Sequence, residues 1–246
     1  MNTYGLIGFP LSHSFSKKYF TSKFEKEHIP NCRYELFELK NINEFPSLIA
    51  SISGLKGLNV TIPYKQEVKQ FLHQFDSSAE KVGAVNVIKV DERGILIGYN
   101  SDYYGFKRSL ENWLPQLNFK ALVLGSGGAS KAVIAALNDL NIPNLLISRQ
   151  SGAGDLTYEK LNKETTYYHS HQLIINTTPL GMSPQTGSCP DLRYDLLGDA
   201  HYLYDLVYNP EETKMMTLGA IKGANVKNGL EMLHLQAEKS WEIWNG

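Results

Sequence analysis

The stretch that most constrains this fold is LVLGSGGASKA, residues 122–132. A short apolar run ends in Gly125, Gly127 and Gly128, and helix-forming residues follow. Strand, glycine turn and helix in this order are typical of a dinucleotide-binding unit, because glycines let the backbone approach a pyrophosphate and the helix N-terminus supplies N–H donors. Ser130 stands where the usual pattern has a glycine, and its small side chain still permits close helix–strand packing. An ordinary strand–helix turn has the same appearance, so the rest of the chain must decide.

Composition excludes several classes of function. A net charge of −1 over 246 residues gives no reason to expect nucleic acid or an anionic membrane as a partner. The chain has no long apolar run for a membrane span, and its first residues lack the pattern of a signal peptide. The two cysteines fit unpaired thiols in a reducing cytoplasm, and no Cys/His cluster has metal-site spacing, so we expect a cytoplasmic protein without a metal.

Strand and helix patterns alternate along the whole chain. We expect strands at 3–8, 33–39, 57–63, 83–90, 95–99, 121–124, 144–148, 173–176, 202–206 and near 226. A turn at 91–94 makes 83–90 and 95–99 a hairpin. The chain closes with an amphipathic helix over 229–244, whose predicted apolar stripe comprises Leu230, Leu233, Ala237 and Trp241. The pattern predicts an α/β fold with parallel sheets in two lobes.

The end of the second strand of the glycine-turn unit bears on the choice of nucleotide. Units that bind NAD commonly place Asp or Glu about 20 residues after the first glycine, to hold the ribose 2′-hydroxyl. This chain has LLISRQ there, with Arg149 and no carboxylate. An arginine suits a 2′-phosphate, so the sequence favours NADP over NAD, although a solvated arginine at a strand end is also common.

Lys65 and Asp102 are the candidate acid/base residues. Each follows a strand and precedes or opens a predicted helix, and ligands of α/β sheets bind at the carboxyl ends of strands. A lysine next to a carboxylate can deliver a proton to a ketone oxygen during hydride transfer. The alternatives are a solvated lysine and a helix N-cap. Polar residues that lie near strand ends in the same half, as candidate ligand contacts or turn residues, are Asn59, Thr61, Asn86 and Asn100.

Two serines stand at the start of the first predicted helix. Ser14 and Ser16 follow a Gly-x-Pro turn. Either would be a good N-cap, and together their hydroxyls could also bind a carboxylate or a polyhydroxylated ligand.

These stretches together resemble the shikimate dehydrogenase family, within the wider shikimate/quinate dehydrogenases. The matching segments are GFPLSHSFS (8–16), GLNVTIPYK (57–65), GAVNV (83–87), GYNSDYYG (98–105), VLGSGGASKA (123–132), NTTPLGM (176–182), YDLVYNP (204–210) and NGLEMLHLQA (228–237). They follow the family's order and extend from one end of the chain to the other.

The resemblance implies a substrate-binding and catalytic domain of residues 1–101 plus 229–246, and a Rossmann-like NADP-binding domain of residues 102–228. It implies reversible reduction of 3-dehydroshikimate to shikimate, in aromatic amino-acid biosynthesis, with Lys65 and Asp102 as the acid/base pair. The implied substrate contacts are Ser14, Ser16, Asn59, Thr61, Asn86, Asp102, Tyr208 and Gln236. The implied cofactor contacts are Gly125, Gly127, Gly128, Ala129, Arg149, Thr177, Met182 and Gly229.

The chain departs from the family pattern at three places. Lys17 follows the HSxS stretch where a proline is usual, and Val87 replaces the threonine of GAVNT. The family's Asn-Arg-Thr after the second nucleotide strand is here Ser148–Arg149–Gln150. The arginine is kept, but the altered flanks leave open how strongly NADP is preferred.

Two other functions remain open on the sequence alone. One is a quinate/shikimate dehydrogenase that uses NAD or both cofactors. The other is a non-catalytic sensor of a small metabolite, against which the presence of both acid/base residues argues. We expect a monomer or a homodimer.

Overall fold

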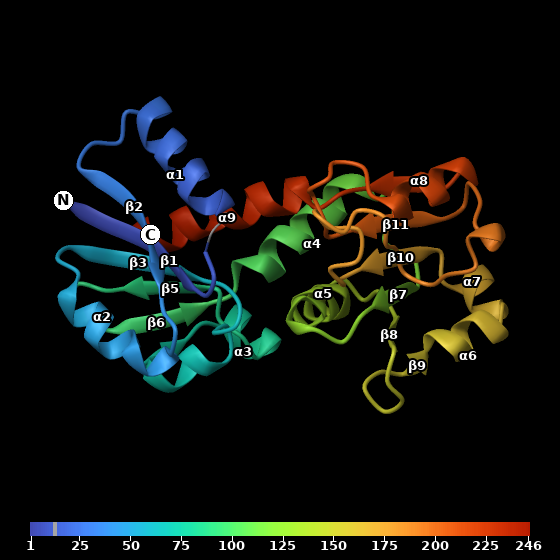
Figure 1. Cartoon of the computed structure of the whole chain (residues 1–246), viewed down its shortest axis with the longest axis horizontal. Helices are drawn as coiled ribbons and strands as arrows, with labels where there is room; N and C mark the ends of the chain where they lie inside the picture. The colour runs from blue at the N-terminus through green and yellow to red at the C-terminus, as the bar shows by residue number, and fades with distance from the viewer. Residues whose placement is uncertain (12–13) are drawn as a thin grey trace. The chain divides into compact units, whose positions relative to one another are not determined.

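The computed structural model describes residues 1–11 and 14–246. The chain forms two compact units, residues 1–104 with 236–246 and residues 105–235 (Figure 1). The domain boundaries expected from the sequence, after residues 101 and 228, fall a few residues earlier along the chain. None of the helices in the described part is long and apolar enough to cross a membrane.

The first unit contains a six-stranded sheet. Its elements are β1 (Asn2–Gly8), α1 (Phe15–Lys26), β2 (Cys32–Glu38), the 3-10 helix η1 (Ile42–Glu44), α2 (Phe45–Ser51), β3 (Leu55–Val60), the 3-10 helix η2 (Glu67–Phe71), β4 (Gln74–Phe75), α3 (Ser77–Val82), β5 (Val87–Val90), β6 (Leu96–Tyr99), the start of α4 (Ser101–Trp113) and the end of α9 (Leu230–Asn245). The strand order is β2-β1-β3-β5-β6-β4.

The sheet of the first unit is mixed, so the expectation of parallel sheets is wrong here. Strands β1, β2 and β3 are parallel, whereas β5 is antiparallel to both β3 and β6. The reversal follows from the tight turn at 91–94, where the Asp91 side chain accepts hydrogen bonds from the N–H groups of Arg93 and Ile95. A turn this short can join only antiparallel strands.

This reversal places several polar residues at one edge of the sheet. Asn59, near the end of β3, pairs with Val87 at the start of β5, and Val87 pairs with Tyr99 at the end of β6. The residues next to these positions therefore gather where β1 and β3 end. They include Asn86, which precedes β5, and Asn100, which follows β6.

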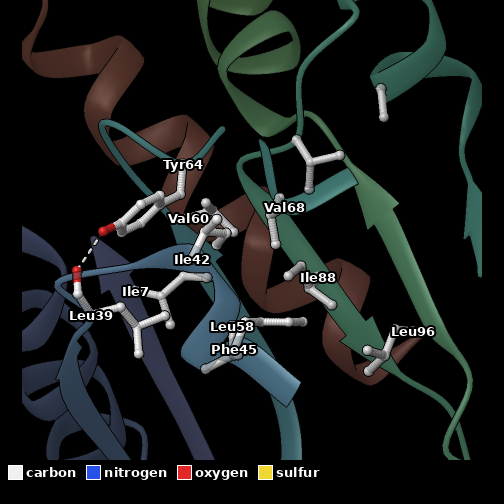
Figure 2. Close-up of a cluster of buried hydrophobic side chains, with 12 residues drawn as sticks. Ile7, Leu39, Ile42, Phe45, Leu58, Val60, Tyr64, Val68, Ile88 and Leu96 are labelled. Carbon is white, nitrogen blue, oxygen red and sulfur yellow. Dashed lines mark hydrogen bonds between the residues drawn. The ribbon is translucent and has the colours of Figure 1, made fainter. Parts of the chain in front are cut away.

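One face of this sheet carries an apolar core that supports the same edge. Figure 2 shows Ile7, Leu58 and Ile88 from three neighbouring strands packed with residues of the flanking helices. Tyr64 is buried in this cluster, and its hydroxyl donates a hydrogen bond to the carbonyl oxygen of Leu39. The loop that leads from β3 to Lys65 is thereby anchored in the core.

The other face packs on α1 and α9. Aromatic rings of Tyr4, Phe20, Phe24 and Trp244 contact one another there, and the Trp244 indole N–H donates to the carbonyl oxygen of Ile88 at 3.0 Å. Gly57 makes this contact possible, because a Cβ at that position would overlap Cδ1 of Trp244.

The second unit is a parallel sheet with helices. Its remaining elements are β7 (Ala121–Leu124), α5 (Gly128–Asp139), β8 (Asn144–Ser148), β9 (Leu156–Thr157), α6 (Tyr158–Lys163), α7 (Thr166–Ser170), β10 (Leu173–Asn176), the 3-10 helix η3 (Tyr194–Leu196), β11 (Tyr202–Asp205), α8 (Lys214–Ile221) and β12 (Asn225–Lys227). The strand order is β12-β11-β10-β7-β8-β9, and all pairs are parallel. The order reverses between β7 and β10, as in Rossmann folds, which confirms the predicted α/β class.

Replacement of Gly57 by alanine tests the close approach of β3 and α9. We expect Gly57→Ala to lower the free energy of unfolding by about 1–3 kcal/mol, because the added methyl group overlaps the Trp244 ring. Gly187→Ala is the control, since no atom lies within 4 Å of its Cβ position. Urea denaturation of both variants measures the difference, and equal stabilities would contradict the packing.

Candidate active site

Lys65 and Asp102 form an ion pair at the polar edge of the first sheet. Lys65 Nζ lies 2.7 Å from Asp102 Oδ2, and the two side chains are 33% and 21% exposed. Lys65 follows the buried Tyr64, and Asp102 lies in the first turn of α4, where the helix dipole favours a carboxylate. The structure therefore brings the two predicted acid/base residues into direct contact and leaves both within reach of a ligand.

Asn100, and not Asp102, is the N-cap of α4. The Asn100 side chain accepts the N–H of Tyr103 at 3.0 Å and so takes the capping role at the start of α4. The same amide donates to the carbonyl oxygen of Ala84 at 2.9 Å. Asn100 is thus a buried structural residue, and the Asp102 carboxylate is left for Lys65.

Asn59 is buried next to α9. Its Oδ1 accepts the hydroxyl of Tyr34 at 2.8 Å, and its Nδ2 donates to Ser240 Oγ at 3.0 Å and to the Asn86 carbonyl oxygen at 3.4 Å. Burial raises the pKa of Tyr34 well above its ordinary value, so this hydroxyl stays protonated and remains a donor.

Asn86 is buried and held by Ser101. Its Oδ1 accepts the N–H of Ser101 at 2.7 Å, and its Nδ2 donates to Ser101 Oγ at 3.0 Å. Gln236 of α9 joins the same group, since its Oε1 lies 3.4 Å from Ser101 Oγ. Thr61 lies directly after β3 and is partly exposed, and its N–H donates to the carbonyl oxygen of Ile7. The structure thus gathers Asn59, Asn86, Thr61 and Gln236 near the strand ends.

The serines at the start of α1 have different partners. Ser14 is the N-cap of the helix and accepts the N–H of Lys17 at 3.3 Å, so the capping alternative is correct for this residue. Ser16 hydrogen-bonds the hydroxyl of Tyr34 and so connects to Asn59. Ser12 and His13, which belong to the stretch that resembles the family, lie outside the described residues.

The glycine turn of the second unit fits a nucleotide phosphate. Gly125 has φ +96° and a Cβ there would lie 2.5 Å from Cγ2 of Thr178, so the turn requires glycine. Gly127 and Gly128, by contrast, have no atom within 4 Å of their Cβ positions. These two bare glycines open the N-terminus of α5, together with the exposed Ala129, and leave room for a pyrophosphate beside the helix N–H groups.

The neighbouring strands complete this region. Thr177, directly after β10, donates its hydroxyl to the carbonyl oxygen of Leu124 at 2.7 Å, which joins the two strands at the point where the order reverses. Met182 is exposed. A Cβ at Gly229 would overlap the carbonyl oxygen of Leu206, so only glycine allows the chain to pass.

Arg149 follows β8 and is exposed, with no ion-pair partner among residues 1–11 and 14–246. Its neighbour Ser148 accepts the N–H of Gln150 at 3.2 Å and lies 3.4 Å from the Ser126 hydroxyl of the glycine turn. The Tyr158 hydroxyl is buried without a hydrogen-bond partner in the described part of the chain. Burial raises the pKa of Tyr158 to about 12, although the positive charge of Arg149 acts in the opposite direction. An available cation beside the glycine turn fits a 2′-phosphate.

A buried polar cluster beneath the loops of the second unit was missed in the sequence. Asp205, at the end of β11, accepts hydrogen bonds from Asn176 Nδ2 at 2.9 Å, the Thr213 hydroxyl at 2.7 Å and the Val207 N–H at 3.0 Å. Burial still raises the pKa of Asp205 above its ordinary value. The cluster ties the loop that begins with Thr177 to the loop that contains the exposed Tyr208. Its signal in the sequence was that Asn176 ends one predicted strand and Asp205 is the second-last residue of another.

The described residues contain no group of three or more His, Cys, Asp or Glu side chains that could hold a metal ion. The Rossmann-type unit and the Lys65–Asp102 pair define a class, the two-domain α/β oxidoreductases that use a nicotinamide nucleotide.

Comparison with known proteins identifies the family within this class. A family model for the shikimate dehydrogenase substrate binding domain matches residues 6–88. The shikimate dehydrogenase (NADP(+)) of Clostridium beijerinckii is 41% identical over 252 residues, which cover 99% of this chain and 92% of that protein. The chain belongs to the shikimate dehydrogenase family.

Solved structures agree with this assignment. Shikimate 5-dehydrogenase of Thermus thermophilus, in complex with NADP(H) and shikimate, has a TM-score of 0.86 at 26% identity, with coverage of 100% of this chain and 94% of that one. The enzyme of Listeria monocytogenes, in complex with shikimate and NAD, has a TM-score of 0.80 at 25% identity, with coverage of 100% and 92%.

Removal of the Thr213 hydroxyl tests the Asp205 cluster. Because the folded-state pKa of Asp205 is raised, its ionised form destabilises the native state increasingly as the pH rises from the ordinary Asp value of about 3.9. Thr213→Val removes a donor to that ionised form and raises the pKa further. We therefore expect a loss of stability of about 1–3 kcal/mol at neutral pH that shrinks as the pH falls.

Thr157→Val is the matched control for this measurement. Thr157 and Thr213 both cap short helices, by accepting the N–H groups of Lys160 and Met216, but only Thr213 also touches a buried carboxylate. Urea denaturation between pH 4 and pH 8 should show a constant loss for Thr157→Val. A constant loss for Thr213→Val as well would contradict the inference that the Thr213 hydroxyl favours the ionised form of Asp205.

Proposed function

We propose that this chain catalyses the NADP-dependent, reversible reduction of 3-dehydroshikimate to shikimate, a reaction of aromatic amino-acid biosynthesis. The observation that carries the proposal is the Lys65–Asp102 ion pair at an edge lined by buried amides, in a chain of this family. Two relatives support the choice of substrate and nucleotide, since the Clostridium beijerinckii protein is a shikimate dehydrogenase (NADP(+)) and the Thermus thermophilus structure holds NADP(H) and shikimate.

We assign the substrate-binding and catalytic role to residues 1–101 plus 229–246, and the nucleotide-binding role to residues 102–228. The polar edge of the mixed sheet supports the first assignment, and the Rossmann strand order with its open glycine turn supports the second.

Lys65 is the proposed proton donor. Reduction of a ketone places a hydride on the carbonyl carbon and a proton on the oxygen, and the Lys65 ammonium supplies that proton. Asp102 accepts a hydrogen bond from Lys65 Nζ and holds it in place. In the reverse direction, Lys65 in its neutral form removes the proton from the substrate hydroxyl as the hydride departs.

The remaining site residues bind and orient. We propose that Ser14 and Ser16 bind the substrate carboxylate at the start of α1, where backbone N–H groups favour an anion. The residues proposed to bind the ring and its hydroxyls are Asn59, Thr61, Asn86, Asp102, Tyr208 and Gln236.

NADPH, when bound, supplies the hydride. We propose that Gly125, Gly127, Gly128 and Ala129 hold its pyrophosphate and that Arg149 binds the 2′-phosphate. Thr177, Met182 and Gly229 are the other proposed contacts. The open space at Gly127 and Gly128 and the exposed cation of Arg149 support this assignment.

A second candidate is a dehydrogenase that uses NAD as well, or acts on quinate. The observation that favours it is the relative from Listeria monocytogenes, whose solved structure holds shikimate and NAD. The altered flanks of Arg149 in Ser148–Arg149–Gln150 point the same way.

We further propose a cytoplasmic enzyme that is a monomer or a homodimer. The two free cysteines suit a reducing compartment.

Initial rates with shikimate and with quinate, each against NADP and NAD, test the proposed function. We expect turnover to be confined to shikimate with NADP. Arg149 can bind the 2′-phosphate of NADP, and the segment around it has no carboxylate that could bind the ribose 2′-hydroxyl of NAD. Comparable turnover with NAD or quinate would establish the second candidate. Stabilisation by shikimate without cofactor reduction would indicate a sensor instead.

Lys65→Ala tests the acid/base assignment. We expect kcat to fall by about 10²–10⁴-fold with little change in KM, because the proton is transferred in the transition state. Lys69→Ala is the control, since Lys69 lies in η2 and its Nζ donates to the carbonyl oxygen of Gly83 and lies over the ring of Phe75, away from Asp102. Near-normal turnover of Lys65→Ala would contradict the acid/base assignment and would indicate that the Lys65–Asp102 ion pair has only a structural role.

A further inference from the structure

We propose that Ser240 and Ser101 are positioning residues, each of which occupies one N–H group of the Asn59 and Asn86 amides, so that this pair selects a hydroxyl group and not a carbonyl. The inference rests on the proposed function, because it concerns the substrate of that site. Ser240 lies on α9 and Ser101 at the start of α4, and both are buried, at 0% and 1% exposed.

Backbone groups fix the direction of both amides. The carbonyl oxygen of Asn86 can only accept, so the Asn59 group that faces it at 3.4 Å must be Nδ2. The N–H of Ser101 can only donate, so the Asn86 group that faces it at 2.7 Å must be Oδ1. Neither amide can turn over without placing two donors or two acceptors against each other.

The direction of the Ser240 hydroxyl follows in the same way. Ser240 Oγ lies 2.8 Å from the carbonyl oxygen of Gln236, which can only accept, so the single Ser240 proton is donated there. Ser240 therefore acts as an acceptor toward Asn59 Nδ2 at 3.0 Å and toward Ser101 Oγ at 3.2 Å. Ser101 accepts in turn from Asn86 Nδ2 at 3.0 Å.

The remaining hydrogen-bonding capacity of the two amides is then determined. Both N–H groups of Asn59 are used, by Ser240 and by the Asn86 carbonyl oxygen, so toward a ligand Asn59 can only accept. Asn86 uses one of its two N–H groups, on Ser101, and keeps the other without a partner among residues 1–11 and 14–246.

One acceptor and one donor side by side match an alcohol. A hydroxyl group can donate to Asn59 Oδ1 and accept from Asn86 Nδ2, whereas a carbonyl oxygen has no proton for Asn59. The reacting oxygen, which alternates between ketone and alcohol, exchanges its proton with Lys65 instead. We therefore assign the amide pair to a ring hydroxyl of shikimate that does not react.

Ser240→Ala is the decisive variant. It removes the acceptor of one Asn59 N–H, so this amide is no longer held as a pure acceptor. We expect the Kd for shikimate, measured by titration calorimetry, to rise about tenfold. For whichever analogue, 4-deoxy- or 5-deoxyshikimate, lacks the hydroxyl bound by the amides, the Kd of the variant should stay within twofold of the wild-type value.

The control is Thr3→Val. Thr3 is equally buried in the same sheet but lies at the start of β1, where its hydroxyl bonds Ser53 and Arg33. This variant should lose thermal stability without any change in either Kd. Should Ser240→Ala fail to fold, Ser101→Ala removes the neighbouring hydroxyl and should give the same dependence on the ligand hydroxyl.

Two results would overturn the inference. One is a Kd for shikimate within twofold of the wild-type value in the Ser240→Ala and Ser101→Ala variants. The other is an equal loss for shikimate and for both deoxy analogues, which would indicate a purely structural role. A wild-type chain that neither binds nor oxidises shikimate would instead overturn the proposed function itself.

Discussion

The antiparallel pairing of β5 with β3 is the constraint on which the first unit depends. In a purely parallel sheet the residue before a strand and the residue at the end of its neighbour lie at opposite edges. Because β5 runs in reverse, Asn86 before β5 and Asn59 near the end of β3 reach the same edge. The same reversal returns β6 so that α4 begins there, which brings Ser101 and Asp102 to the amides and to Lys65.

Buried polar groups then determine how precisely that edge is built. An amide that is removed from water must have its donors and acceptors paired, and each partner restricts its direction. In the first unit the amides of Asn59 and Asn86 are fixed by hydroxyls and backbone groups. In the second unit Asn176 and Asp205 serve a similar purpose beneath the loops that follow β10 and β11. Both units thus hold their loops by buried polar contacts near the carboxyl ends of strands.

Much of the fold could be predicted from the sequence. The strand, glycine turn and helix start at 121–132 and the hairpin across 91–94 depend on local patterns, and both are confirmed. The short elements β4, β9, α6, α7 and α8 were missed, because a few residues carry too little periodicity. The first sheet was predicted to be parallel, although the short turn at 91–94 already requires an antiparallel pair of strands in it.

The site was less accessible, because its geometry depends on contacts between distant residues. Lys65 and Asp102 were identified by their place after strands, but their contact spans 37 positions of sequence. The closing helix shows the limit most clearly. Its predicted stripe comprised Leu230, Leu233, Ala237 and Trp241, whereas the helix buries Ala237, Ser240 and Trp244, and Leu230 is exposed. A hydrophobic pattern cannot predict the burial of Ser240, since a serine is buried where its hydroxyl has hydrogen-bond partners, here Asn59 and Gln236.

The difference in burial between the amides and the ion pair fits the proposed chemistry. Asn59, Asn86, Ser101 and Ser240 are almost fully enclosed, so their hydrogen bonds do not exchange with water and their directions persist. Lys65 and Asp102 keep a third and a fifth of their side chains exposed, so protons can reach them. A proton donor that must be recharged after each turnover needs this access, whereas groups that recognise a hydroxyl by direction need the opposite. The same sheet edge provides both because the amides lie under α9 and the lysine lies on the loop beyond Tyr64.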